Sequence, residues 1–182
     1  MISFDFSACR VAMLAEIGDV LNQAKDQELA CFAGEILAAR RVFLAGAGRS
    51  GLAMRMLACR LSQAGLVAHF VGDATTPACG AGDLLLAGSA SGSTRTLLVA
   101  VEQAKKAKAR VLAITGSAKS LLAKKADKTT VLRGNARIKS KQPMGSLFEQ
   151  SLVMAGDMIA NAVICGLGLE ETDLRARHAN LE

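Results

Sequence analysis

The stretch Arg41-Val42-Phe43-Leu44-Ala45-Gly46-Ala47-Gly48-Arg49-Ser50-Gly51 passes from an apolar run into a glycine-rich loop. A helical pattern follows it, over about residues 50–64. A second apolar run, residues 83–88, ends in the hydroxyl-rich loop Ser89-Ala90-Ser91-Gly92-Ser93-Thr94. A strand that ends in a small-residue loop and opens a helix points backbone N–H groups at its ligand, which favours an anion. We therefore expect two anion-binding loops, one after each of two strands.

Short apolar runs alternate with helical stretches from residue 41 onward. The expected strands are residues 42–45, 67–71, 84–87, 111–115 and 129–132. The helices expected between them are about residues 50–64, 93–107 and 119–126. Such alternation predicts an α/β fold: a doubly wound, five-stranded parallel sheet of the flavodoxin-like kind, with helices on both faces. Ligands bind at the carboxyl ends of the strands in such sheets, where both loops lie.

The length of 182 residues fits one domain with a sizeable core. Within a single domain over residues 1–182 we expect N-terminal helices in 1–40, the α/β core in 41–132, and a C-terminal helix and tail in 143–182. The long helix, about residues 146–167, carries apolar residues on more than one stripe. One chain should cover one of its faces, so we expect a partner subunit on the other.

The amino-acid composition favours some classes of protein and ligand over others. Hydrophobic residues make up 51% and charged residues 21%, as in a globular chain. The net charge of +6 weakly favours anionic ligands. Trp and Tyr are absent, however, so the chain has few aromatic side chains on which nucleic-acid bases could stack. The five cysteines form no C-x-x-C pair, which indicates free thiols in a reducing compartment. We see no signal peptide and no uninterrupted apolar membrane span, and we expect a cytoplasmic protein.

The first loop has more than one interpretation. Gly46-x-Gly48-x-x-Gly51 matches the dinucleotide fingerprint, and Asp73 follows the next expected strand, as in an NAD-dependent oxidoreductase. The hydroxyl-rich loop, however, has no role in a dinucleotide fold. Asp73 could equally cap a turn. From the residues alone, a dinucleotide site, a site for a single sugar phosphate and purely structural glycines all remain open.

The chain resembles the sugar isomerase (SIS) domains, and among them the 6-phospho-3-hexuloisomerases. The resemblance rests on five segments: residues 46–51, residues 71–77, residues 89–94, the block Gln142-Pro143-Met144-Gly145-Ser146-Leu147-Phe148-Glu149-Gln150, and the tail Arg177-His178-Ala179-Asn180-Leu181-Glu182. It implies an isomerase that converts 3-hexulose 6-phosphate to fructose 6-phosphate in the ribulose monophosphate pathway of formaldehyde fixation. It also implies a homotetramer that needs no cofactor and no metal.

The resemblance also implies roles for individual residues. Glu149 becomes the candidate base and His178 the candidate acid; spacing alone favours a capping box at Ser146-x-x-Glu149 and a solvated tail histidine. The expected phosphate ligands are Ser50, Ser89, Ser91 and Thr94, with Gly48, Arg49 and Ser93 in secondary roles. Helix caps and turn hydroxyls are the alternative for each of these hydroxyls. Arg49 could pair with phosphate or hold a neighbouring acid.

Two residues depart from the family pattern. Ala90 stands where the second loop usually has glycine, and Ser93 stands where it usually has glutamate. Ala90 needs a negative φ, and Ser93 could cap the following helix. A non-catalytic sugar-phosphate sensor built on the same domain is the alternative to an enzyme, although such sensors usually carry an added DNA-binding domain.

Overall fold

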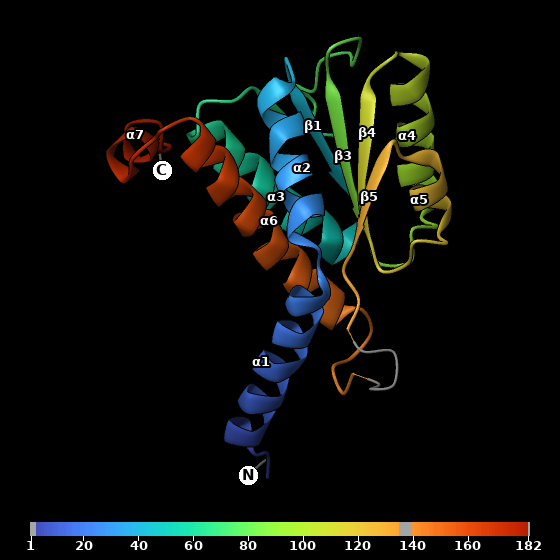
Figure 1. Ribbon diagram of the computed structural model, residues 1–182, viewed down its shortest axis with the longest axis vertical. Helices are drawn as coiled ribbons and strands as arrows, with labels where there is room; N and C mark the ends of the chain where they lie inside the picture. Colours follow the sequence, from blue (N-terminus) through green and yellow to red (C-terminus); the bar gives the residue numbers. More distant parts are fainter. Residues whose placement is uncertain (1–2, 135–139, 182) are drawn as a thin grey trace.

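The computed structural model describes residues 3–134 and 140–181, and these contain one five-stranded parallel sheet (Figure 1). The strand order is β2-β1-β3-β4-β5. The strands are β1 (Val42–Gly46), β2 (Ala68–Phe70), β3 (Leu84–Ser89), β4 (Arg110–Thr115) and β5 (Lys128–Val131). This is the doubly wound, flavodoxin-like order, whose direction of winding reverses between β1 and β3. The expected fold class is confirmed.

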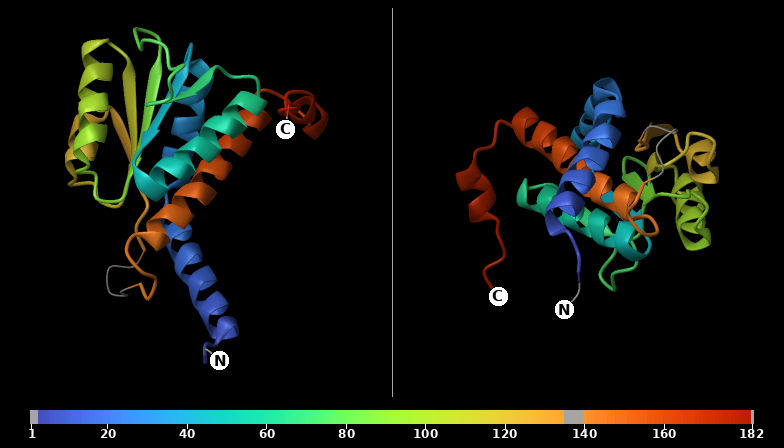
Figure 2. Two further views of the ribbon diagram at one scale, coloured as in Figure 1. Left: turned by 180° about the vertical axis from the view of Figure 1, so that it is seen from behind. Right: turned by 90° about the horizontal axis from the view of Figure 1, so that it is seen from below.

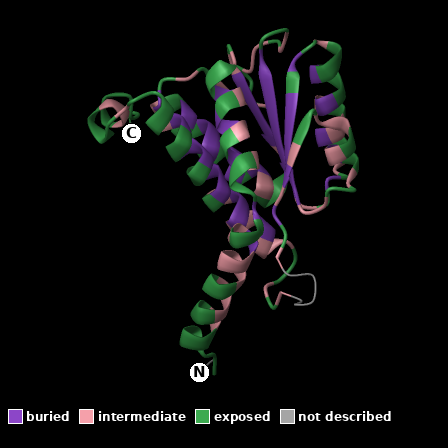
Figure 3. Ribbon diagram, viewed as in Figure 1, coloured by how far each residue is buried: buried purple, intermediate pink, exposed green. Residues whose placement is uncertain are grey.

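Helices cover both faces of the sheet (Figures 1 and 2). Helices α2 (Asp26–Ala38), α3 (Gly48–Gln63) and α6 (Ser146–Gly166) lie on one face, and α4 (Arg95–Lys106) and α5 (Leu121–Lys125) on the other. The strand side chains alternate between these layers, as the pleat requires. Val42 and Leu44 join the core on the α3 side, whereas Phe43 and Ala45 face α4. Figure 3 shows the central strands buried between the two layers, whereas the edge strands β2 and β5 are only partly buried.

Several element boundaries differ from the sequence-based expectation. Helix α3 begins at Gly48, two residues early, and α4 begins at Arg95, two residues late. The N-terminal segment forms two helices, α2 and the preceding α1 (Phe6–Gln23). A short helix, α7 (Glu171–Ala176), was missed in the charged tail. Its start is stabilised because the Asp173 carboxylate accepts a hydrogen bond from the Glu170 N–H at 2.9 Å.

The chain itself covers one side of the last helix and leaves apolar side chains exposed on the other, as the sequence led us to expect. Helix α6 lies between α2 and α3, so the chain itself buries a wide arc of α6, from Phe148 to Val163 (Figure 2). By length and composition alone α6 could cross a membrane, but 44% of its most apolar window is buried inside the chain. Met154 and Met158 remain 48% and 42% exposed on its outer side.

Helix α1 projects away from the α/β body (Figure 1). Large apolar side chains on it lie in the open: Phe6 is 74% exposed, Val11 66% and Leu14 65%. At its base, Glu16 accepts hydrogen bonds from the Ser140 hydroxyl at 2.6 Å and the Lys141 N–H at 3.0 Å. The hydrogen bond from Ser140 is the largest cause of a lowered pKa at Glu16, and that from Lys141 is the next. These bonds join α1 to the segment that leads into α6.

Candidate functional site

The two anion-binding loops lie side by side at the point where the sheet changes its direction of winding. Strands β1 and β3 are neighbours, and Gly46 pairs in register with Gly88. Residues 46–51 and 89–94 therefore leave the same edge of the sheet next to each other. Each leads into the N-terminus of a helix of more than two turns, α3 or α4. Open α/β sheets bind ligands at such a crevice.

The glycines of the first loop allow a tight turn from β1 into α3. A Cβ on Gly51 would come 2.8 Å from the Gly46 carbonyl oxygen, and Gly48 has a φ of +55°. Close packing of strand and helix thus accounts for the G-x-G-x-x-G spacing without a dinucleotide. The carboxylate of Asp73 forms an ion pair with Arg55 at 2.7 Å, and Arg55 stacks over the Phe70 ring. The acid that a dinucleotide site would need is therefore already paired.

Hydroxyl groups of the second loop hydrogen-bond to the loop itself. The Ser89 Oγ accepts from the Gly92 N–H at 3.1 Å and lies 3.3 Å from the Thr94 Oγ1. The Ser91 Oγ accepts from the Ser93 N–H at 3.3 Å and from the Ser93 hydroxyl at 3.1 Å. Ser89 is buried, whereas Ser91 and Ser93 are exposed. The loop therefore presents one buried hydroxyl and two exposed hydroxyls beside the N-terminus of α4.

The expected cap at Ser93 was wrong, since Thr94 is the N-cap residue of α4 and the Ser93 hydroxyl turns back to Ser91. Thr94 itself makes no side-chain capping bond. Among the described non-glycine residues, only Lys108 and Met144 have positive φ. Ala90 is therefore free of the strain that a glycine-requiring position would impose.

The Glu149 carboxylate reaches across to the start of α3, where it forms an ion pair with Arg49. This pairing overturns the predicted capping box: Gly145 is the N-cap residue of α6, and no side chain caps that helix. Arg49 Nε contacts Glu149 Oε2, and Oε1 has no hydrogen-bond partner among the described residues. The Glu149 side chain is 18% exposed. One carboxylate oxygen is thus held in place while the other is free to accept a proton.

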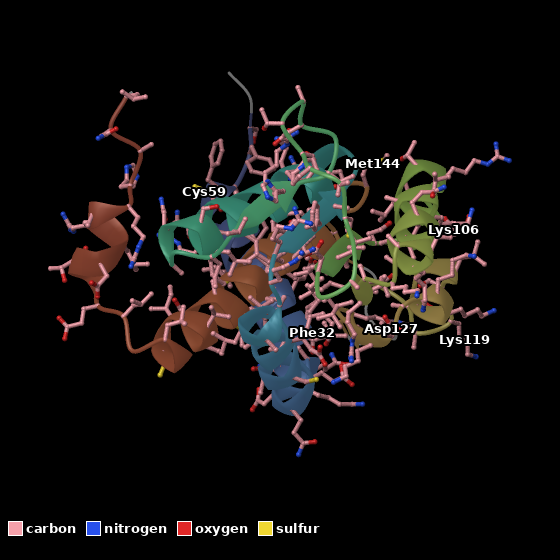
Figure 4. The ribbon with its side chains drawn as sticks, turned by 90° about the horizontal axis from the view of Figure 1, so that it is seen from above. Phe32, Cys59, Lys106, Lys119, Asp127 and Met144 are labelled. Atoms are coloured by element: carbon pink, nitrogen blue, oxygen red, sulfur yellow. The ribbon has the colours of Figure 1, made fainter. Side chains whose placement is uncertain are left out.

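The pair places Glu149 next to the first anion-binding loop. Ser50 follows Arg49 in the first turn of α3 and is partly buried. Met144, labelled in Figure 4, lies in the segment that leads into α6, has a φ of +54° and is fully exposed. The predicted base, Ser50 and the secondary residues Gly48 and Arg49 therefore gather at the start of α3, at the edge of the sheet from which the second loop also leaves.

His178 lies elsewhere in the chain. It is exposed after α7, with its Nδ1 3.0 Å from the Ala179 carbonyl oxygen. It lines a cavity of 650 Å³ together with residues of α3, α6 and α7. Helix α6 carries Glu149 at its start and leads to the tail at its other end, a rise of about 26 Å. Within one chain the structure does not bring the two predicted catalytic residues together, because the start of α6 and the C-terminal tail lie at opposite ends of that helix (Figure 1).

Sequence reasoning missed the contacts made by the connection between β4 and α5. Thr115 ends β4 and is fully buried, and the Gly116 N–H donates to the Ala90 carbonyl oxygen at 3.0 Å. The strand order could have indicated that the two segments are neighbours, because β4 follows β3 in the sheet and ends at the same edge, but the backbone hydrogen bonds themselves leave no mark in residue types. No group of three metal-ligating side chains lies together in the part of the chain that the structure describes.

Comparison with known proteins gives concordant matches. The SIS domain family matches residues 35–154. A 3-hexulose-6-phosphate isomerase of Mycobacterium gastri is 41% identical over 92% of this chain and 86% of its own length. One of Bacillus subtilis is 38% identical over 90% of this chain and 89% of its own. A Methanococcus jannaschii crystal structure, from which a 3-hexulose-6-phosphate isomerase function was inferred, has a TM-score of 0.86 and 28% identity, covering 96% of this chain and 99% of that one.

Proposed function

Since the chain belongs to the SIS domain family, we propose that it is an isomerase that converts 3-hexulose 6-phosphate into fructose 6-phosphate. The observation that carries this proposal is the Glu149 carboxylate, held by Arg49 at the sheet edge from which both anion-binding loops leave. Relatives with this named activity match over nine tenths of the chain. The enzyme would serve the ribulose monophosphate pathway of formaldehyde fixation.

The reaction moves a carbonyl group from C3 to C2 of the sugar. A base removes the proton on C2, the C3 carbonyl oxygen gains a proton to give a 2,3-enediol, the C2 hydroxyl then loses its proton, and a proton is returned to C3. Substrate and product contain the same atoms, so proton transfers alone complete the conversion. We assign the proton transfers to Glu149, whose Oε1 is unpartnered among the described residues. The Arg49 guanidinium beside it would offset negative charge on the enediolate oxygens.

The phosphate group would lie between the two loops. The N-termini of α3 and α4 supply unpaired backbone N–H groups and positive dipole ends at this edge. Ser50, Ser89, Ser91 and Thr94 add hydroxyl donors, with Gly48 and Ser93 in supporting positions. A hydroxyl that now accepts from its own loop can turn its proton toward the phosphate without moving its oxygen.

The active unit is a homo-oligomer, which we propose to be a tetramer. Two features support a second copy: exposed apolar side chains on α1 and α6, and the separation of His178 from Glu149 along α6. A neighbouring chain would bring its His178 beside Glu149, where the imidazole could protonate a sugar oxygen. The five free cysteines fit the reducing cytoplasm, where we place the protein.

A coupled assay tests the activity. The purified protein is mixed with 3-hexulose 6-phosphate, generated from ribulose 5-phosphate and formaldehyde by the upstream synthase, and fructose 6-phosphate is measured. Steady formation of fructose 6-phosphate is expected. Binding of the sugar phosphate without turnover would indicate a sensor instead. Thermal stabilisation by NADH together with no turnover would indicate a dinucleotide enzyme.

A further inference from the structure

The segment from the last residue of β4 to the second residue of α5, residues 115–122, lies against the hydroxyl-rich loop and hydrogen-bonds two of its carbonyl groups. The Gly116 N–H donates to the Ala90 carbonyl oxygen at 3.0 Å, and the Leu122 N–H donates to the Gly92 carbonyl oxygen at 2.8 Å. The Thr115 hydroxyl lies 3.4 Å from the same Ala90 oxygen. Residues 115–122 therefore donate the hydrogen bonds that both carbonyl oxygens accept.

Residues 89–94 and residues 115–122 are closely packed against each other. Gly92 has a φ of +58°, and a Cβ added there would lie 2.5 Å from the Ser120 Oγ. A Cβ on Gly116 would lie 2.8 Å from the Ala90 carbonyl oxygen. Ser120 is itself fixed, because its Oγ accepts from the Ala123 N–H at 3.1 Å and caps α5. A shift in either segment by the size of a methyl group would displace the other.

This arrangement has an electrostatic consequence for a bound phosphate. A carbonyl oxygen carries partial negative charge, so one that faced a phosphate dianion would repel it. Hydrogen bonds from Gly116 and Leu122 turn the Ala90 and Gly92 oxygens toward residues 115–122. The hydroxyls of the loop, together with those N–H groups that do not donate to Ser89 or Ser91, are then left to face the anion, as in the backbone concavities that bind phosphate.

We infer that Thr115, Gly116 and Ser120 are positioning residues for phosphate binding, which act by fixing the shape of residues 89–94. The inference rests on the proposed function, because it concerns the same phosphate site. None of the three needs to touch the sugar. Disturbing them should weaken binding of the phosphate group, while the proton-transfer step at Glu149 keeps its rate.

Gly116→Ala tests the contact directly. The added methyl group should push the Ala90 carbonyl out of place, raise KM for 3-hexulose 6-phosphate by about ten- to a hundredfold, and leave kcat within about threefold. The dissociation constant for inorganic phosphate, measured by titration calorimetry, should rise in parallel. Gly34→Ala is the matched control, since Gly34 is exposed in α2 with open space around it. Its KM should equal that of the wild type.

A pair of substitutions tests whether the effect passes through Ser120. Gly92→Ala should raise KM, because the new Cβ meets Ser120 and because its positive φ is strained. Adding Ser120→Gly removes the two nearest colliding atoms but leaves the Thr115 Oγ1, 2.9 Å from the new Cβ, and the backbone strain. The double variant should therefore recover part of the lost phosphate affinity, by about threefold or more. Additive losses in the double variant would contradict contact between the segments.

The outcomes separate this inference from the proposed function. If the wild type neither binds phosphate nor forms fructose 6-phosphate, the proposed function fails and the inference with it. If the wild type does both and folded Gly116→Ala keeps wild-type KM and phosphate affinity, only the inference is overturned. Should Gly116→Ala fail to fold, Thr115→Val replaces it, since this variant keeps the buried shape and removes the hydroxyl. A severalfold rise in KM is then expected, and an unchanged KM overturns the inference.

Discussion

Arg49 and Glu149 form an ion pair that joins the first turn of α3 to the first turn of α6, across 100 residues of sequence. The pair brings a carboxylate from the C-terminal helix to the sheet edge where the glycine-rich loop turns into α3. It holds Oε2 and leaves Oε1 without a hydrogen-bond partner in the part of the chain that the structure describes. Local spacing around Glu149 would instead have made it a capping residue.

Arg49 should matter more for activity than for stability. Its side chain is 65% exposed, so Arg49→Met should change the free energy of unfolding by less than about 1 kcal/mol. Loss of the guanidinium should let the Glu149 carboxylate move, which lowers kcat by about ten- to a hundredfold. Arg49→Lys should restore part of the rate, because it keeps the charge but not the planar fork. Denaturation curves and steady-state kinetics measure both effects. A wild-type kcat in Arg49→Met would mean that the pair does not position the carboxylate.

Changing either Ser89 or Ser91 to alanine should raise KM, but only the change at Ser89 should lower the stability of the fold. The buried Ser89 Oγ accepts from the Gly92 N–H, and Ser89→Ala leaves that donor unpaired, at a cost of about 1–3 kcal/mol. Ser91 is exposed, so solvent can replace its hydrogen bonds. Each loss of a hydrogen bond to phosphate should raise KM by about ten- to a hundredfold. Urea denaturation compares the two variants, and equal stabilities would argue against the loop geometry.

Asp83 should support the fold without affecting the reaction. Burial alone would raise the pKa of its carboxyl group, but hydrogen bonds from Arg41, Arg40 and the Gly80 N–H hold that pKa well below its usual range. A lowered folded-state pKa adds stability above the unfolded pKa of about 4, and this stability is lost as the pH falls further. Asp83 precedes β3, at the edge of the sheet opposite the site.

Asp83→Asn should therefore lower the free energy of unfolding at pH 7 by about 1–3 kcal/mol and leave kcat/KM unchanged. The difference in stability between wild type and variant should shrink as the pH falls below about 4. Thermal denaturation from pH 7 to pH 3 measures this difference. A gap that stayed constant with pH would show that the Asp83 charge is not what stabilises the fold.

The three central strands, β1, β3 and β4, were predictable from the sequence because they are buried on both faces and read as apolar runs, whereas the edge strands β2 and β5 are only partly buried. The two loops were predictable for the same reason, since a small-residue loop after such a run marks the carboxyl edge. The Arg49–Glu149 pair was foreseen only as one role open to Arg49, because local spacing could not show that α6 returns to α3. The hydrogen bonds from residues 115–122 to Ala90 and Gly92 involve backbone groups, which leave no mark in residue types.

His178 should act on the site of a neighbouring chain. Mixing inactive Glu149→Gln with inactive His178→Ala should restore activity after subunit exchange, because one class of mixed site then holds both intact side chains. With random exchange in a two-chain unit, roughly a quarter of the sites should recover. Exchange is verified with differently tagged chains. Full activity from a demonstrably monomeric wild-type sample, or no recovery despite proven exchange, would contradict the shared site.

The turnover of Glu149→Gln on 3-hexulose 6-phosphate tests the central claim most directly. The amide keeps the size of the side chain and can still contact Arg49, but it cannot accept the C2 proton. We predict a kcat about 10²- to 10⁴-fold below wild type, with an unchanged melting temperature and unchanged affinity for inorganic phosphate. Glu171→Gln, which alters an exposed acid that pairs with Arg175, provides the matched control and should keep full activity. A folded Glu149→Gln enzyme with near-normal kcat would contradict the assignment of Glu149 as the base.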